Sequence, residues 1–180
     1  KPRLILIAGP TSSGKTTTSK KLQMYLKLKG IKTVQISVDD YFVDRKDTPK
    51  DKNGENDYES LYAIDVTLFN KHLSKLLNGE KVLMPRYDFL SGEKYYKDDY
   101  LQVDKDTLFI IEGLHSLNDE LTLSIERNMK YKIYISPLTQ LNIDNHNRIH
   151  TSDIRRLRRI IRDNRTRGYN STATLAMWRK

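Results

Sequence analysis

The residues with the clearest chemistry lie near the start of the chain, where they match the spacing G-x-x-x-x-G-K-[ST]. This spacing predicts a loop whose backbone N–H groups surround a phosphate chain, and it runs Gly9-Pro10-Thr11-Ser12-Ser13-Gly14-Lys15-Thr16. An apolar run at 4–8 precedes the loop and a helical pattern at 16–29 follows it, so the local context agrees. A glycine-rich turn that matches by chance is the alternative. The pattern and its context favour a nucleoside triphosphate site.

Individual side chains of this segment have expected tasks. The N-terminus of the following helix adds partial positive charge, which favours a bound anion. Lys15 is expected to reach the terminal phosphates, and the Thr16 hydroxyl is expected to hold Mg²⁺. Thr17, next along the helix, is assigned to the same nucleotide site.

Carboxylates follow two predicted strands. The alternating apolar residues of 32–38 lead into Asp39 and Asp40, and the apolar run 107–111 leads into Glu112. Ligands of parallel α/β sheets bind at the carboxyl ends of the strands. A carboxylate such as Asp39 could accept a proton from an attacking hydroxyl there, and Glu112 could hold Mg²⁺ directly or through water. The alternatives are a turn or cap for the Asp pair and a surface position for Glu112.

An arginine-rich segment at 153–167 predicts an amphipathic helix. Ile154, Leu157 and Ile161 share one face, which is expected to pack against the rest of the fold, and most of the arginines point elsewhere. Arginines on such a helix would close over a triphosphate as a lid and exclude water. Nucleic-acid binding would also explain the arginines but not the other motifs, so we do not expect a nucleic-acid partner.

The composition narrows the class of protein. The chain has 180 residues and a net charge of +9, which suits polyphosphate or nucleic-acid ligands. It contains no cysteine, which excludes disulfides, thiolate zinc sites and cysteine nucleophiles. Neither a membrane-spanning run nor a signal peptide is visible, so a cytoplasmic protein is expected. Because the chain begins at Lys1 without Met, we interpret it as a piece of a longer protein.

Strands alternating with helices predict an α/β fold: a P-loop NTPase-type parallel sheet with helices on both faces, in one domain over 1–180. The apolar run 131–136 predicts a further strand of this sheet. Between the two carboxylate-bearing strands we predict a polar loop at 43–60, a helix capped by Asp65 and a small β excursion at 82–103. Two more helices are predicted at 119–127 and 138–149.

The motifs favour one reaction class. A GTPase would carry an Asn-Lys-x-Asp motif, which is absent from this sequence. A small-molecule kinase needs an acid that positions the acceptor hydroxyl and arginines that neutralise the moving phosphoryl group, and this chain offers both. A nucleotide-gated regulatory module without an acceptor is the alternative from a different class.

Taken together, these motifs resemble the uridine kinase/phosphoribulokinase family of P-loop kinases, most of all its bacterial uridine-kinase-like branch. The resemblance extends over nearly the whole chain. It rests on the phosphate loop, Val38-Asp39-Asp40-Tyr41-Phe42, Tyr58-Glu59 to Asp65, Pro85-Arg86-Tyr87-Asp88-Phe89, Ile111-Glu112-Gly113 and Arg158-Arg159-Ile160-Ile161-Arg162-Asp163 with Arg167-Gly168.

The resemblance implies ATP and Mg²⁺ as cofactors and a small-molecule acceptor as partner. It implies that Asp39 takes the proton of a sugar 5′-hydroxyl, that Lys15 and Arg162 are catalytic with it, and that Glu112 and Thr16 serve the metal. The residues implied to bind the acceptor are Asp39, Tyr58, Glu59, Tyr87, Phe89 and Arg159. Arg159 and Arg167 are implied to hold ATP together with the phosphate loop.

Glu59 stands where nucleoside kinases of the family have an Asp, and Tyr58 where they have a Phe. Two further departures from the family pattern remove groups that read the base. Nucleoside kinases of the family carry a base-reading His where this chain has Gly92, and a Gln near the lid is replaced at about Met177. The resemblance therefore implies uridine or cytidine as the first acceptor but leaves a non-nucleoside sugar phosphate or alcohol open. The family's final strand would lie beyond Lys180, and an additional N-terminal domain and a homo-oligomer are both compatible with it.

Overall fold

The computed structural model describes residues 2–137 and 141–178. The described residues form two compact units. One comprises 2–8 and 15–134, and the other comprises 9–14, 135–137 and 141–178. The first unit contains the sheet and its helices with Lys15 and Thr16, and the second contains residues 9–14 of the phosphate loop and the arginine-rich helix.

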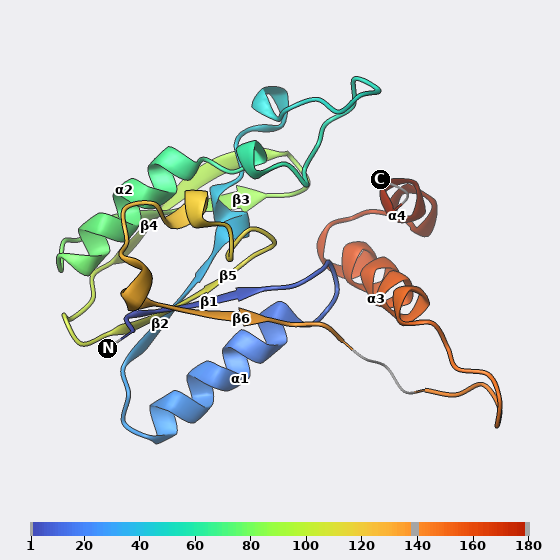
Figure 1. The fold of residues 1–180 in the computed structure, drawn as a ribbon. Coiled ribbons are helices and arrows are strands. Elements are labelled where there is room, and N and C mark those ends of the chain that lie inside the picture. Colours follow the sequence, from blue (N-terminus) through green and yellow to red (C-terminus); the bar gives the residue numbers. More distant parts are fainter. Residues whose placement is uncertain (1, 138–140, 179–180) are drawn as a thin grey trace. The chain divides into compact units, whose positions relative to one another are not determined.

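A parallel four-stranded sheet forms the centre of the first unit (Figure 1). Its strands β1 (Leu4–Ala8), β2 (Thr33–Ser37), β5 (Leu108–Glu112) and β6 (Lys130–Tyr134) lie in the order β2-β5-β1-β6. β1 pairs on both sides and is apolar throughout, as expected of a strand buried on both faces. Ser37 and Ile7 both lie opposite Glu112, so β1, β2 and β5 end at one edge of the sheet.

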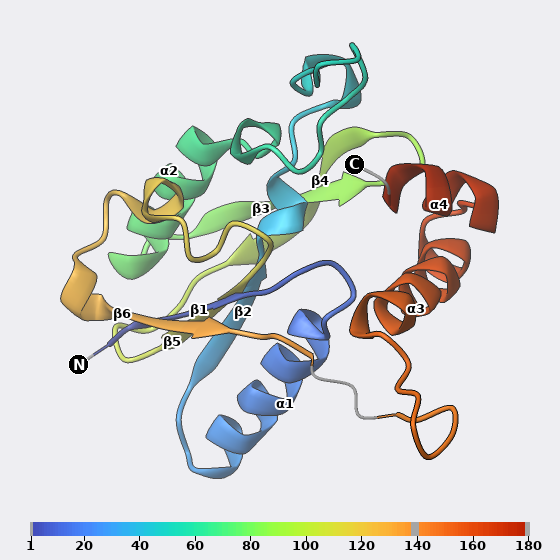
Figure 2. The same cartoon turned by 45° about the vertical axis from the view of Figure 1, so that its right-hand side comes forward.

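Helices α1 (Lys15–Leu28) and α2 (Val66–Leu77) lie on opposite sides of this sheet (Figures 1 and 2). α2 buries Phe69, Leu73 and Leu76 in the main core, which includes residues of β1, β2 and β5. The Asp65 carboxylate accepts a hydrogen bond from the Leu68 N–H at 2.9 Å, which confirms the predicted cap. The structure confirms the α/β fold with a parallel sheet.

A separate antiparallel hairpin confirms the predicted β excursion (Figure 2). Its strands are β3 (Val82–Asp88) and β4 (Glu93–Leu101), with an irregularity of register between Leu83 and Pro85. The connection at 43–60 is a polar loop, as predicted, and contains only a short 3₁₀ turn at Arg45–Asp47 and an isolated bridge between Lys50 and Asn56.

The helix predicted at 119–127 is wrong. The chain instead forms two 3₁₀ turns, Asp119–Thr122 and Arg127–Met129. Buried Leu121 and Ile125 are four residues apart, which imitates a helical face, but their N–H groups bond three residues back. The Asn118 side chain caps the first turn through the Glu120 N–H, so local side-chain bonding replaces the helix.

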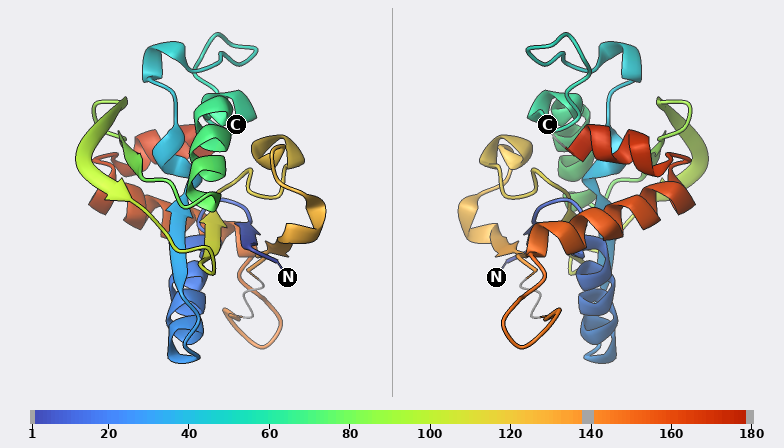
Figure 3. Two further views of the ribbon diagram at one scale, coloured as in Figure 1. Left: turned by 90° about the vertical axis from the view of Figure 1, so that its left-hand side faces the viewer. Right: turned by 90° about the vertical axis from the view of Figure 1, so that its right-hand side faces the viewer.

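The second unit contains helices α3 (Thr151–Thr166) and α4 (Ser171–Trp178), which pack against each other (Figure 3). α3 confirms the predicted arginine-rich helix, whereas α4 was not predicted. Gly168 lies between them with φ +67°, a conformation that glycine adopts without strain.

The packing face predicted for α3 is wrong, because Leu157 and Ile161 are 60% and 53% exposed, while the Arg159 side chain is only 13% exposed. Pairing with Asp163 and the Trp178 ring turns arginines inward instead.

The helix predicted at 138–149 is wrong over its described part, because 141–149 form a bridged turn. Residues 138–140 lie outside the described residues. Ile149 N–H donates to Leu141 O at 2.9 Å, and Asn142 bridges Arg148. The Asp144 carboxylate accepts from the N–H groups of His146 and Asn147, which is how Asp side chains compete with helical bonding.

Candidate active site

The phosphate loop has a backbone that few sequences tolerate. Ser12 has φ +61° and Gly14 has φ +100°, and the Ser13 N–H donates to Pro10 O at 3.1 Å. A Cβ on Gly9 would collide with the Ile135 carbonyl oxygen. A left-handed conformation at a serine costs about 1–3 kcal/mol and is found mostly at functional sites.

This loop also contains two orphan polar atoms. Among the described residues, the hydroxyls of Ser12 and Ser13 are buried without a hydrogen-bond partner. Burying an unpartnered hydroxyl costs free energy, which an incoming acceptor oxygen would recover. The strained backbone and the two orphan donors therefore fit a phosphate group.

Glu112, at the end of β5, is the central residue of the candidate metal site. The Thr16 hydroxyl donates to its Oε1 at 3.0 Å and the Ser37 hydroxyl donates to the same atom at 3.4 Å. The residue is 6% exposed, and burial raises the pKa of its carboxyl, with the negative charge of Asp39 as a further cause.

These residues fit Mg²⁺ better than they fit a metal whose ligands are all protein side chains. Within residues 2–137 and 141–178, no group of three or more His, Cys, Asp or Glu side chains is placed to hold a metal. Mg²⁺ is usually bound by one or two carboxylates together with substrate phosphates and water. A single buried carboxylate beside the Thr16 hydroxyl is such a set.

Asp39 and Asp40 stand on a 3₁₀ turn, Val38–Tyr41, directly after β2. Buried Tyr41 anchors this turn: its hydroxyl lies 3.2 Å from His72 Nδ1 on α2, and its carbonyl accepts from the Asp65 N–H at 2.8 Å. Asp40 pairs with Arg86 of β3 at 3.3 Å; burial raises its pKa and the arginine partly offsets this. The turn that carries Asp39 is therefore attached to both α2 and β3.

The aromatic residues predicted for the acceptor pocket form one cluster. The rings of Tyr87 and Phe89 are 5.1 Å apart, and Phe42 contacts both of them and Tyr58 at centroid distances of 5.3–6.2 Å. Sequence analysis did not assign Phe42 to the acceptor site, although its position three residues after Asp39 could have indicated that it lies there. Glu59 is exposed, and its carbonyl oxygen lies 2.8 Å from His115 Nε2.

Gly92 lies next to this cluster in the turn of the hairpin, where a side chain would be strained and would meet Arg45. Its φ is +77°, and a Cβ built there would lie 2.5 Å from Nε and 2.6 Å from Cζ of Arg45. The Arg45 guanidinium donates to the carbonyls of Phe89 and Leu90 at 3.0 and 3.2 Å. An arginine thus fills the position where the resemblance places a base-reading His.

The arginines predicted to form the lid gather around one carboxylate in the second unit. Asp163 is fully buried and pairs with Arg162, Arg159 and Arg167 at 2.7, 3.3 and 3.8 Å. In the same unit, Arg155 Nε donates to the Thr11 carbonyl at 2.9 Å, so α3 contacts the phosphate loop. Sequence analysis missed the roles of Asp163 and Arg155, although Asp163 stands within the motif that it used.

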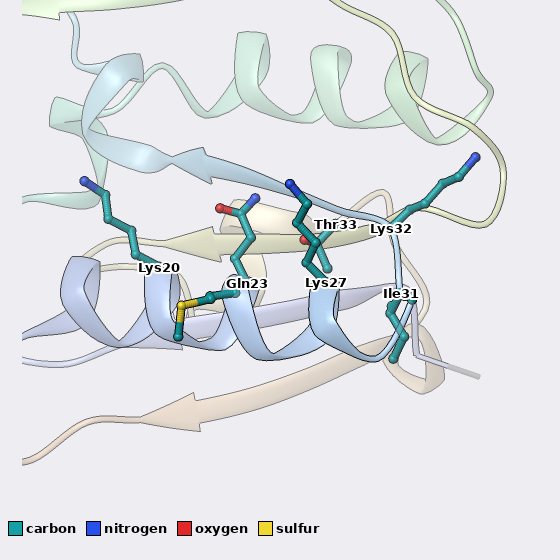
Figure 4. A pocket seen from close by; sticks show the side chains of 8 residues that line it. Lys20, Gln23, Lys27, Ile31, Lys32 and Thr33 are labelled. Carbon is teal, nitrogen blue, oxygen red and sulfur yellow. The ribbon is translucent and has the colours of Figure 1, made fainter.

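A surface hollow of about 630 Å³ lies elsewhere, between α1 and the start of β2 (Figure 4). Lys20, Gln23, Lys27 and Lys32 are among the residues that line it. None of the predicted site residues lines this hollow, so we do not assign it to the reaction.

The model of the phosphoribulokinase/uridine kinase family matches residues 4–180. The chain belongs to this family. Members of the family that resemble it include a uridine kinase from Brevibacillus brevis, 31% identical over 93% of this chain and 69% of that protein. A uridine kinase from Halalkalibacterium halodurans is 28% identical over all of this chain and 76% of that protein.

The family's fold is also seen in a solved structure. The protein described as "a Possible Uridine Kinase" from Bacillus stearothermophilus matches with a TM-score of 0.59 at 21% identity, over 74% of this chain and 70% of that one. Membership of the family makes the chain a P-loop small-molecule kinase. Among the described helices, none is long and apolar enough to cross a membrane.

Proposed function

We propose that this kinase transfers the γ-phosphate of Mg-ATP to a hydroxyl of a small molecule, with the 5′-hydroxyl of uridine or cytidine as the first acceptor to test. The observation that carries the proposal is the Thr16–Glu112 hydrogen bond of 3.0 Å at the edge of the sheet where β2 leads into Asp39. Relatives that are about 30% identical are named uridine kinase, which supports the pyrimidine nucleoside.

Each candidate residue has a role in this reaction. The acceptor oxygen forms a bond to Pγ while the bond from Pγ to the β–γ bridging oxygen breaks, and Asp39 takes the acceptor's proton. Lys15 and the arginines of α3 offset the negative charge that develops on the phosphoryl oxygens. Thr16 and Glu112 would hold Mg²⁺, which would supply positive charge to offset the negative charge of the phosphates.

Arg159, Arg162 and Arg167 are the proposed lid of the nucleotide site. Asp163 brings their guanidinium groups together before any phosphate binds. Pre-oriented donors lose less freedom on binding, so more of the interaction is available to the transition state. Exclusion of water by these residues would favour transfer to the acceptor over hydrolysis.

One observation favours a second class of acceptor. Arg45 places a permanent positive charge beside the aromatic cluster, where the resemblance leads us to expect a neutral base-reading group. A sugar phosphate or another anionic alcohol would suit that charge. The aromatic cluster of Phe42, Tyr87 and Phe89 suits a flat base, so uridine and cytidine stay first.

The test is acceptor-dependent ADP release by the full-length protein with Mg-ATP. The panel holds uridine, cytidine, other nucleosides, sugar phosphates and simple alcohols. Release with a pyrimidine nucleoside supports the first acceptor, and release with sugar phosphates alone supports the second. ATP binding with no acceptor-dependent release across the panel would favour the regulatory module.

Two variants test the assignment of residues in the same assay. Asp39→Asn is expected to keep ATP affinity while turnover falls roughly 10²–10⁴-fold, the usual contribution of a general base. Lys15→Ala is expected to weaken ATP binding, measured by calorimetry. Unchanged turnover in the first variant would remove Asp39 from catalysis, and unchanged affinity in the second would count against the whole site.

Three further expectations stay predictions: one kinase domain over 1–180, a homo-oligomer and a cytoplasmic location.

A further inference from the structure

Trp178 of α4 is the only tryptophan of the chain, and it lies against the arginine face of α3. Its ring centroid is 5.2 Å from Cζ of Arg155 and 5.8 Å from Cζ of both Arg156 and Arg159. Guanidinium groups within about 6 Å of a ring are attracted to its electron-rich face, and tryptophan attracts them most strongly. No role of Trp178 was assigned by the motifs.

Arg159 is held from two directions. Trp178 lies on one side, and the buried carboxylate of Asp163 accepts from Arg159 Nε at 3.3 Å. The Arg159 side chain is only 13% exposed, which is unusual for an arginine that pairs with one residue of its own helix. The ring and the carboxylate together restrict its rotamers.

Arg155 extends this arrangement to the phosphate loop. Its Cζ faces the Trp178 ring while its Nε donates to the Thr11 carbonyl at 2.9 Å. All of these groups belong to the same compact unit, which includes both the loop and the two helices. The ring therefore contacts arginines at the loop and arginines at Asp163.

The charge on α3 makes such support necessary. The helix carries the aspartates Asp153 and Asp163 and six arginines, Arg155, Arg156, Arg158, Arg159, Arg162 and Arg165. Like charges on one helix repel each other, and long side chains in water lose rotamer freedom when a ligand fixes them. A flat ring that attracts several guanidinium groups opposes both effects.

We propose that Trp178 is a positioning residue for the polyphosphate of the nucleotide: its ring, together with Asp163, holds the arginines of α3 in place before the nucleotide binds. This inference rests on the proposed function, because it assumes that the loop and the arginines serve a nucleoside triphosphate. Trp178 acts through the arginines and contacts no reacting atom.

The variants Trp178→Leu and Trp178→Phe separate attraction by the ring from simple packing. Leucine fills space without a π face, so KM for ATP should rise roughly fivefold to thirtyfold and kcat should fall, while KM for the acceptor stays unchanged. Phenylalanine keeps a weaker π face, so KM for ATP and kcat of Trp178→Phe should stay within about threefold of the native values. Leu175→Ala, also in α4 but more than a third exposed, controls for loss of bulk in this helix.

A second measurement needs no variant. Because Trp178 is the only tryptophan, fluorescence excited at the red edge, where the eleven tyrosines do not absorb, reports its surroundings alone. A triphosphate that binds guanidinium groups within 6 Å of the indole should change the emission, with the same midpoint as calorimetric ATP binding.

The outcomes separate this inference from the proposed function. A Trp178→Leu protein with native ATP affinity and turnover would overturn the role of Trp178 and leave the kinase proposal standing. Emission that stays constant while calorimetry records ATP binding would do the same. If the native protein binds no Mg-ATP, both proposals fail. A rise in KM for ATP in the Leu variant, rescued by Phe and absent in Leu175→Ala, is the expected result.

Discussion

Glu112 shows at the scale of one residue how a functional group is kept at a cost to stability. It is buried at the end of a central strand, where two hydroxyls donate to it and the positive charge of Lys15 only partly offsets the effect of burial. Its pKa is raised by burial and by Asp39, so in the absence of Mg²⁺ the folded state holds the proton more tightly than the unfolded chain. The free energy of unfolding therefore falls as the pH rises above the ordinary value of 4.5 towards the raised pKa.

Glu112→Gln removes that charge while it keeps the shape of the side chain. At pH 7 without Mg²⁺, the variant should melt at a higher temperature than the native protein, and the difference should shrink as the pH falls towards 4.5. Mg²⁺-dependent turnover should fall at least about tenfold, because a residue that holds the metal is lost. Calorimetric melting and the ADP assay measure the two effects.

Glu120→Gln is the matched control for this variant. Glu120 is exposed, so its replacement should change neither melting nor turnover. Native activity of Glu112→Gln at ordinary Mg²⁺ concentrations would show that Glu112 has no part in holding the metal.

At the scale of elements, the hairpin of β3 and β4 shows how one turn and a distant arginine are packed together. Its turn needs a positive φ at Gly92, and Arg45 from the preceding loop covers that glycine. The same guanidinium bonds the carbonyls of Phe89 and Leu90, so the aromatic wall and the turn are joined. The packing of Arg45 is therefore adapted to a glycine at 92, and a side chain placed there would require Arg45 to move.

Gly92→Ala should destabilise the fold for two reasons, and a second glycine separates them. Gly54 has φ +79°, close to the +77° of Gly92, but no atom lies within 4 Å of a Cβ built on it. Gly54→Ala should therefore cost only the conformational strain, on the order of 1 kcal/mol. Gly92→Ala should cost more, because its Cβ also meets Arg45. Urea unfolding measures both.

The double variant Arg45→Ala, Gly92→Ala completes this comparison. Without the guanidinium, the alanine at 92 should cost about as much as the alanine at 54, which gives a coupling between positions 45 and 92. Additive effects of the two substitutions would mean that Arg45 does not oppose a side chain at 92.

At the scale of the whole molecule, the excess positive charge lies partly at the candidate site and partly on the rest of the surface. The chain carries 32 Lys and Arg against 23 Asp and Glu, and the difference of 32 − 23 gives the net +9. Six of those arginines are on α3, in the same unit as the phosphate loop. A polyanion that binds the folded chain alone should stabilise it by mass action.

Mg-ATP at about 100 times its dissociation constant should stabilise the protein by about 2.7 kcal/mol. For a chain of this size, that corresponds to a rise in melting temperature of roughly 5–10 °C. Differential scanning calorimetry measures the shift, and Lys15→Ala, with weakened ATP binding, should show little of it at the same concentration. An RNA oligonucleotide that produces a shift as large as ATP would favour the nucleic-acid interpretation of the arginines instead.

Local features could be predicted from the sequence because the groups that form them are close along the chain. The turn of the phosphate loop, the helix that follows it and the Asp65 cap depend on bonds among neighbours. β1 could be predicted from its unbroken apolar run, although its own bonds are to the distant strands β5 and β6. Asp39, Thr16 and Glu112 could also be placed at one edge, because the carboxyl ends of parallel strands coincide. Where side chains competed with the backbone, as Asp144 and Asn118 do, the same reasoning predicted helices that do not form.

The remaining features depend on residues brought together from distant parts of the chain. Arg45 covers Gly92 from 47 positions away (92 − 45), and Arg155 reaches Thr11 from 144 positions away. The sequence shows that Asp163 and Trp178 are present. It does not show which arginines they contact, because those contacts form only when α3 and α4 pack together. A sequence pattern specifies which groups are present and how neighbours bond. Only the folded chain decides which distant charges and rings meet, because those contacts depend on how every element packs.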